Sequence, residues 1–142
     1  MAGGLGKRMN SEVPKVLHLL KNKPLIIHVI ESALKINPIK IGIIVGKYRE
    51  IIEKTINNYI NINSKIEYID QSEALGTGHA ITCCKNFLSN YKNSYVTILS
   101  GDVPLIKTNT LEKLINNTNN LEASILINKL ENPYGYGRIL KH

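Results

Sequence analysis

Short runs of apolar residues alternate along the chain with longer stretches in which apolar positions recur at helical spacing. The short runs predict strands at residues 39–45, 65–69, 95–99 and 123–130. The longer stretches predict helices at residues 24–36, 48–59 and 78–88, and from Thr108 or Thr110 to Asn116. Because strands that alternate with helices build parallel sheets, this order predicts a doubly wound α/β fold with both sheet faces covered.

Composition fits one domain that can bury a core. The chain has 142 residues, of which 43% are hydrophobic and 20% are charged. Cys83 and Cys84 are adjacent and cannot form an ordinary disulfide with each other, which favours a reducing, cytoplasmic setting. The longest apolar stretch, residues 24–30, is interrupted by His28 and is far shorter than the roughly 20 residues that span a bilayer. We therefore expect neither membrane insertion nor secretion.

The charge favours anionic partners without naming one. Eighteen Lys and Arg residues against eleven Asp and Glu give a formal charge of +7, which attracts polyanions of any kind. No basic run is interleaved with aromatic residues, and the chain has no Trp and one Phe. Nucleic-acid binding is therefore disfavoured.

Glycine-rich and acidic segments follow the predicted strands, where ligands bind in open α/β sheets. Residues 2–9 (AGGLGKRM) place Gly3, Gly4 and Gly6 beside Lys7 and Arg8. Backbone without side chains can approach a phosphate closely while two cations neutralise it. The segment matches neither a Walker motif nor a dinucleotide fingerprint, and a simple turn is the alternative.

Three further segments carry candidate chemistry. Lys15, in residues 14–18 (PKVLH), offers a mobile cation or is only a solvated lysine. Residues 71–80 (QSEALGTGHA) combine Gln71, whose amide can pair with a base edge, with Gly76 and with Thr77, which could equally cap a helix. Surface packing is favoured for His79 over a role as catalytic base.

The last two segments suit a metal and an anion. Asp102 follows a predicted strand, and a carboxylate there suits Mg²⁺ that keeps several waters and bridges substrate phosphates. The alternative is an Asp that caps the next turn. Residues 134–138 (YGYGR) combine two glycines with Arg138, which suits phosphate or carboxylate, or they form only a turn.

Together these segments resemble the sugar-phosphate nucleotidyltransferases, and within them the N-acetylglucosamine-1-phosphate uridyltransferases. The family's opening AAGxGTRM is matched as AGGLGKRM, while PKVLH, LGTGHA, GDVPLI and GYGRI are matched as they stand. The resemblance implies the Rossmann-like nucleotide-diphospho-sugar transferase fold. It also implies that the phosphate of N-acetylglucosamine 1-phosphate attacks the α-phosphorus of UTP, which gives UDP-N-acetylglucosamine and pyrophosphate.

Roles for individual residues follow from the same resemblance. The loop that holds the uracil and phosphates of UTP would be formed by Ala2, Gly3, Gly4 and Gly6, with Arg8 on the triphosphate. Lys15 would offset charge at the α-phosphate, while Gln71, Gly76 and Thr77 would recognise the uracil. Asp102 would bind Mg²⁺, and Gly137 would contact the sugar through its backbone.

The sequence departs from the family pattern in ways that leave alternatives open. Gly3 replaces an alanine and Lys7 a threonine, as in guanylyl- and thymidylyltransferases, so another sugar-1-phosphate nucleotidyltransferase is an alternative. The family's first strand precedes the glycine loop, where Met1 stands here, and members continue beyond GYGR. We therefore expect residues 1–142 to form a single partial nucleotidyltransferase domain, incomplete at both ends and without a β-helix acetyltransferase domain. A second chain could complete it, or the chain is a non-catalytic nucleotide-binding remnant.

Overall fold

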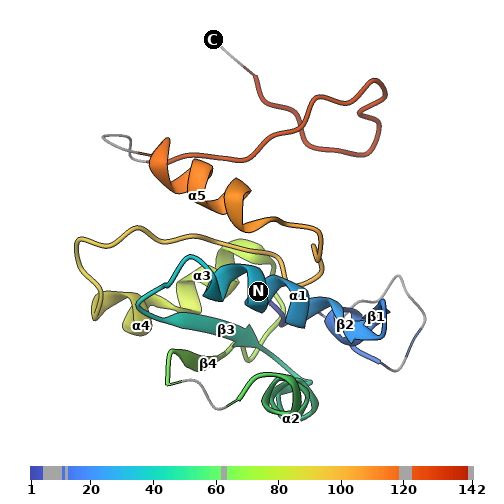
Figure 1. Cartoon of the computed structure of the whole chain (residues 1–142), viewed down its shortest axis with the longest axis vertical. Helices are drawn as coiled ribbons and strands as arrows, with labels where there is room; N and C mark the ends of the chain where they lie inside the picture. Colours follow the sequence, from blue (N-terminus) through green and yellow to red (C-terminus); the bar gives the residue numbers. More distant parts are fainter. Residues whose placement is uncertain (5–10, 12, 62–63, 119–122, 141–142) are drawn as a thin grey trace.

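The computed structural model describes residues 1–4, 11, 13–61, 64–118 and 123–140. Its elements are the 3₁₀ turn η2 (Lys15–Leu17), strands β1 (Leu19–Leu20) and β2 (Lys23–Pro24), helix α1 (Leu25–Leu34), strand β3 (Ile41–Val45), helix α2 (Arg49–Tyr59), strand β4 (Ile66–Asp70), and helices α3 (Thr77–Cys83), α4 (Lys85–Ser89) and α5 (Thr108–Asn116). Figure 1 shows the helices gathered around β3 and β4. The chain is thus an α/β protein.

The parallel pair β3 and β4 forms the centre of the fold. Ile41 pairs with Ile66, and the register continues to Val45 and Asp70. The amide of Ala2 donates to the Ile44 carbonyl at 2.8 Å, and the Met1 amino group donates to the Leu99 carbonyl at 2.7 Å. The first residues of the chain therefore lie between β3 and the segment that ends at residue 99, well inside the molecule (Figure 1).

Helices cover both faces of β3. Ile43 and Val45 pack with buried residues of α1 and α2, among them Ile27 and Ile52. Ile44 points to the opposite face, where it packs with Ala80 and Cys84. Alternate strand residues point to opposite faces, so a continuous apolar run is what a strand buried on both sides requires. Each fully buried Ile stabilises the fold by about 2–3 kcal/mol.

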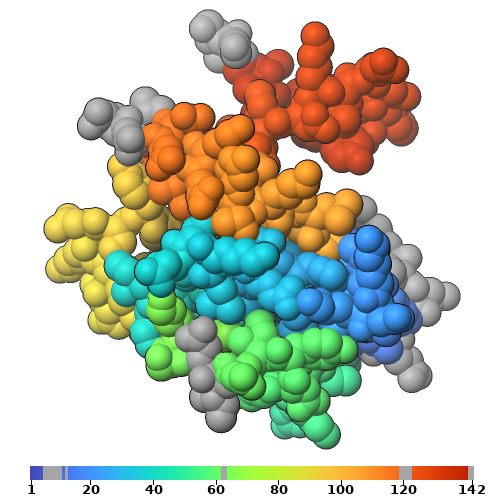
Figure 2. All heavy atoms as spheres, in the orientation of Figure 1, coloured from blue at the N-terminus to red at the C-terminus, as the bar shows by residue number. Residues whose placement is uncertain are grey.

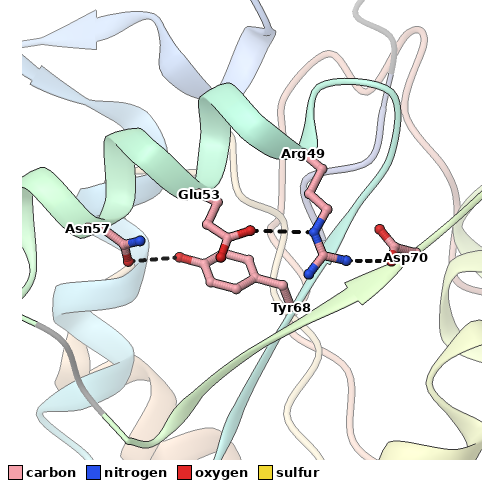
Figure 3. A network of polar contacts seen from close by, with 5 residues as sticks. All are labelled: Arg49, Glu53, Asn57, Tyr68 and Asp70. Carbon is pink, nitrogen blue, oxygen red and sulfur yellow. Dashed lines mark hydrogen bonds and ion pairs between the residues drawn. The ribbon is translucent and has the colours of Figure 1, made fainter.

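A polar network ties α2 to β4 at the surface (Figure 3). The Arg49 guanidinium lies between Glu53, at 3.4 Å, and Asp70, which it also contacts. The Tyr68 hydroxyl donates to Asn57 at 3.4 Å. These pairs are exposed, so they fix the position of α2 more than they stabilise it.

Most predicted elements are confirmed, with small shifts at their ends. The helices predicted at 24–36, 48–59 and 108–116 are α1, α2 and α5, and the strands predicted at 39–45 and 65–69 are β3 and β4. The helix predicted at 78–88 is divided into α3 and α4, because the Cys84 amide bonds back only three residues, to the Ile81 carbonyl. The β1–β2 hairpin was not predicted; it turns at Lys21 and Asn22, both with positive φ.

The strands predicted at residues 95–99 and 123–130 are wrong, because the structure has no strand there. Both segments leave apolar side chains exposed, including Val96 and Ile98 in the first and Ile125 and Ile127 in the second. A strand needs a neighbouring strand to pair with, and at the end of the first segment the Leu99 carbonyl accepts from the amino group of Met1, which belongs to no strand. Figure 2 shows the residues beyond α5, in red, as a lobe that stands off the rest of the molecule.

Candidate active site

A cavity of about 520 Å³ lies beyond the carboxyl ends of β3 and β4. Four segments that are far apart in the sequence line it: residues 1–4, 15–16, 71–80 and 100–102. Eight predicted site residues lie on its wall, namely Ala2, Gly3, Gly4, Lys15, Gln71, Gly76, Thr77 and Asp102. The fold thus brings most of the predicted site into one hollow.

Lys15 and Asp102 form an ion pair inside this cavity. The Lys15 ammonium nitrogen lies 2.5 Å from a carboxylate oxygen of Asp102, and both side chains are partly exposed. Asp102 therefore pairs with a lysine, and Lys15 is not simply a solvated side chain. An anion and a cation held together in this way can separate toward a metal ion and a polyphosphate.

Glycine at position 101 is what lets this pair form. A Cβ on Gly101 would lie 2.9 Å from the Met1 carbonyl oxygen and 3.2 Å from a methyl carbon of Val16. The Gly101 amide donates to that Met1 carbonyl at 2.9 Å. Val16 is itself buried, so this close packing brings Lys15 and Asp102 to the same wall.

Gln71 is buried in the wall of the cavity, and its side-chain nitrogen has two contacts. Its side-chain nitrogen donates to the Gly76 carbonyl at 3.2 Å and lies 3.3 Å from Nδ1 of His79. Its side-chain oxygen faces Gly3, where an added Cβ would approach it to 2.7 Å. Glycine at position 3 therefore allows the backbone of the first segment to pass directly beside this amide.

Gly76 and Thr77 form the opposite rim. Gly76 has φ +105°, a conformation that side chains rarely adopt, and the chain turns there into α3. Gly76 is the N-cap of α3 and Thr77 is its first residue, so Thr77 does not occupy the capping position. Both residues are exposed to the cavity and leave room for a ligand.

The amino group of Met1 also lies on the cavity wall. Burial lowers its pKa from the usual value of 8.0, and interactions with Cys84 and Asp102 partly oppose that shift. With Lys15, it gives the cavity two basic groups beside one carboxylate. Such a set favours an anionic ligand that carries a cation of its own.

The structure does not place every predicted residue here. Gly137 is exposed on the lobe beyond α5 and is not among the residues that line the cavity, and its contact with a sugar stays a prediction. Arg138 of the same turn donates to the Tyr136 carbonyl. Gly6 and Arg8 lie outside the described residues.

Metal binding at this cavity would rest on Asp102. In the described part of the chain, no group of three or more His, Cys, Asp and Glu side chains could hold a metal ion. A single carboxylate still suits Mg²⁺, which keeps several waters and takes further oxygens from substrate phosphates. No helix within the described ranges is long and apolar enough to cross a membrane.

Comparison with known proteins gives one consistent picture. The family model described as nucleotidyl transferase matches residues 1–141. A bifunctional protein GlmU of Nitrosomonas eutropha is 40% identical over 99% of this chain and 30% of its own length. A probable UDP-N-acetylglucosamine pyrophosphorylase of Acanthamoeba polyphaga mimivirus is 41% identical over 99% of this chain and 55% of its own length.

The chain thus spans about half or less of the length of the curated relatives it matches. The match covers all four segments that line the cavity. The chain belongs to the nucleotidyl transferase family.

Proposed function

We propose that this chain transfers a uridylyl group from UTP to N-acetylglucosamine 1-phosphate, with release of pyrophosphate. The observation that carries the proposal is the convergence of Lys15, Asp102 and Gln71 on one cavity from three separate segments. The relatives, which include a probable UDP-N-acetylglucosamine pyrophosphorylase, support this substrate pair.

Proteins catalyse phosphoryl and nucleotidyl transfer mainly by positioning the reactants and by stabilising charge. Lys15, together with Arg8, would bind the triphosphate and stabilise charge at the α-phosphate. Asp102 would hold Mg²⁺, which when bound neutralises phosphate charge. The ion pair between Lys15 and Asp102 keeps both groups at one wall of the cavity until they meet these partners.

Recognition of the nucleoside would fall to the opposite wall. Ala2, Gly3, Gly4 and Gly6 would follow the nucleotide with bare backbone, and Gln71, Gly76 and Thr77 would contact the base. The close approach of Gly3 to the Gln71 side-chain oxygen supports this assignment, since the two segments then form one continuous surface. The thiols of Cys83 and Cys84 are both free, which supports a cytoplasmic setting.

We also propose that residues 1–142 form a partial nucleotidyltransferase domain whose doubly wound sheet is completed by a strand from a second chain. An apolar groove of about 450 Å³ separates β3 from residues 95–99. Side chains of α1, such as Ile30, line one face of it, and those of α3 and α4, such as Ile81 and Phe87, line the other.

The backbone at the end of this groove supports such a strand. On the β4 side, the Ile41 amide donates to the Lys65 carbonyl, and the Val45 carbonyl accepts from the Gln71 amide. Because successive peptide groups of a strand point to opposite sides, those of Gly42 and Ile44 point toward the groove. Ile44 already accepts a hydrogen bond from Ala2 there. The added strand would carry apolar residues on both faces and would run parallel to β3. It would end beside Met1 and continue the hydrogen-bond ladder of β3.

Pyrophosphate release tests the proposed reaction. The purified chain is assayed with Mg²⁺, N-acetylglucosamine 1-phosphate and, in turn, UTP, dTTP, GTP and CTP, with and without a peptide that fits the groove. We expect release that prefers UTP and is lost in Asp102→Asn. Asp70→Asn is the matched control, because Asp70 pairs with Arg49 outside the cavity.

Each alternative gives a different result. Preference for dTTP or GTP would identify another sugar-1-phosphate nucleotidyltransferase. Titration that shows UTP binding without release under any condition would identify a non-catalytic nucleotide-binding protein. A folded chain that binds no nucleotide at millimolar concentration would refute the proposed function.

A further inference from the structure

We infer that His79 is a positioning residue that fixes the orientation of the Gln71 amide and thereby sets which base edge the cavity accepts. The inference rests on the proposed function for the identity of the ligand. It does not depend on that function for the orientation itself, which is a property of the protein alone.

The Gly76 carbonyl determines which end of the amide faces it. A backbone carbonyl oxygen can only accept, so the contact at 3.2 Å requires the amide nitrogen of Gln71. The side-chain oxygen is then turned toward Gly3 on the cavity wall. Gln71 is buried, so an amide turned the other way would leave the Gly76 contact as two facing oxygens.

His79 supplies the second acceptor for the same nitrogen. Its Nδ1 lies 3.3 Å from the Gln71 nitrogen, so the contact is a hydrogen bond only when Nδ1 carries no proton. The ring proton then sits on Nε2, which faces the Cys83 sulfur at 4.0 Å. His79 and Cys83 lie one turn apart on α3, so the helix itself holds the ring in this orientation.

An amide with both hydrogens engaged offers the ligand only an acceptor. The Gln71 oxygen can then receive the N–H of a uracil ring, whereas the corresponding ring nitrogen of cytosine is itself an acceptor and is repelled. Selectivity between two bases of the same size would thus come from a residue that does not touch the base.

Loss of the His79 acceptor would weaken this orientation. The Gly76 carbonyl would then be the remaining partner of the Gln71 nitrogen among these two contacts, and one hydrogen of the amide would be free. An amide with a free hydrogen can donate to a ligand, so it no longer selects for a base edge that donates.

The test follows the side-chain amide of Gln71 by NMR in the isotope-labelled full chain without nucleotide. We expect its resonances to change in His79→Leu, which has no acceptor at the Nδ1 position. In His79→Asn, whose side-chain oxygen can accept near the Nδ1 position, the amide should keep the resonances of the parent chain. His28→Asn is the matched control, since His28 contacts the Leu20 carbonyl far from the cavity.

Nucleotide selectivity gives the second readout. The ratio of UTP to CTP affinity should fall by about tenfold in His79→Leu, which is the usual effect of one neutral hydrogen bond. The ratio should keep the value of the parent chain in His79→Asn. The same ratio in His79→Leu and in the parent chain would overturn the inference.

The two proposals fail in different ways. If no nucleotide binds while the Gln71 amide follows His79, the proposed function fails and the positioning role of His79 stands. If UTP binds and the amide does not respond to the ring, the positioning role fails and the function stands.

Discussion

The ammonium of Lys15 and the carboxylate of Asp102 lie 2.5 Å apart on the wall of the cavity. Each group therefore neutralises the other in the protein alone. Under the proposed function, a polyphosphate and its metal ion would separate the pair and replace it with two contacts to the ligand. The arrangement would then couple nucleotide binding to metal binding.

Replacement of Asp102 should separate the effect on metal binding from the effect on nucleotide binding. In Asp102→Asn we expect pyrophosphate release to fall by at least about a hundredfold, the scale seen when one preorganised charge contact is removed. UTP affinity measured in EDTA should stay the same or rise, because Lys15 is no longer paired. Calorimetric titration of UTP with and without Mg²⁺ measures both, and metal-dependent turnover that survives in the variant would contradict the role of Asp102.

Gly3→Ala should destabilise the protein because its new methyl group meets Gln71. The added Cβ would lie 2.7 Å from the Gln71 side-chain oxygen. Overpacking of this kind costs about 1–3 kcal/mol in the free energy of unfolding.

Gly4→Ala is the matched control for that experiment, since an added Cβ there meets nothing within 4 Å. Urea unfolding of both variants measures the difference. Gly3→Ala combined with Gln71→Ala should recover most of the lost stability, and additive effects of the two substitutions would show that the predicted contact is absent.

The buried amino group of Met1 should make the fold more stable as the pH rises toward 8. Its pKa is lowered in the folded state, so the unfolded chain binds the proton more readily. The stability contribution is complete above the unfolded value of 8.0 and is lost as the pH falls through the folded value.

Denaturant unfolding at a series of pH values between the lowered pKa and 8.0 measures this effect. Burial raises the pKa of the Cys84 thiol above its usual 9.0, so this thiol stays neutral throughout that range. A chain with an acetylated amino terminus should lose this part of the pH dependence. The same slope in both chains would assign it to another group.

A peptide strand should bind the groove between β3 and residues 95–99. The probe is a peptide of about five alternating Val and Ile residues with lysines at its amino end, a usual strand length. Binding should slow hydrogen exchange of the Ile44 and Leu99 amides, which would gain partners. A peptide with a central proline is the control, and equal exchange with both peptides would refute the completing strand.

Sequence patterns were most informative where local and tertiary preferences agree. The apolar run that became β3 and the amphipathic stretches that became α1 and α2 pack on one another, so each supports the others. Residues 95–99 and 123–130 carry equally good strand patterns, but neither segment forms a strand in the structure. Strand formation depends on pairing, which a local pattern does not contain.

The residues of the candidate site could be predicted from the sequence, whereas the contacts between their side chains could not. Glycine loops and charged residues after strands predicted the residues of the cavity, because parallel strands end at one edge of a sheet. The pairing of Lys15 with Asp102 and the contact of His79 with Gln71 were not predicted, since each joins side chains of separate segments or depends on a rotamer. The signal for His79 was its position in the LGTGHA motif, eight residues after Gln71.

Residues 123–130 also form a segment that is prone to aggregation. Ile125, Leu126 and Ile127 form an uncharged aliphatic run whose residues are 72%, 55% and 62% exposed, and exposed segments of this kind favour cross-β stacking between molecules. Lys129 and Glu131 follow it closely and place charges at one end, which opposes such stacking. We therefore expect this short stretch to limit the concentration at which the protein stays in solution.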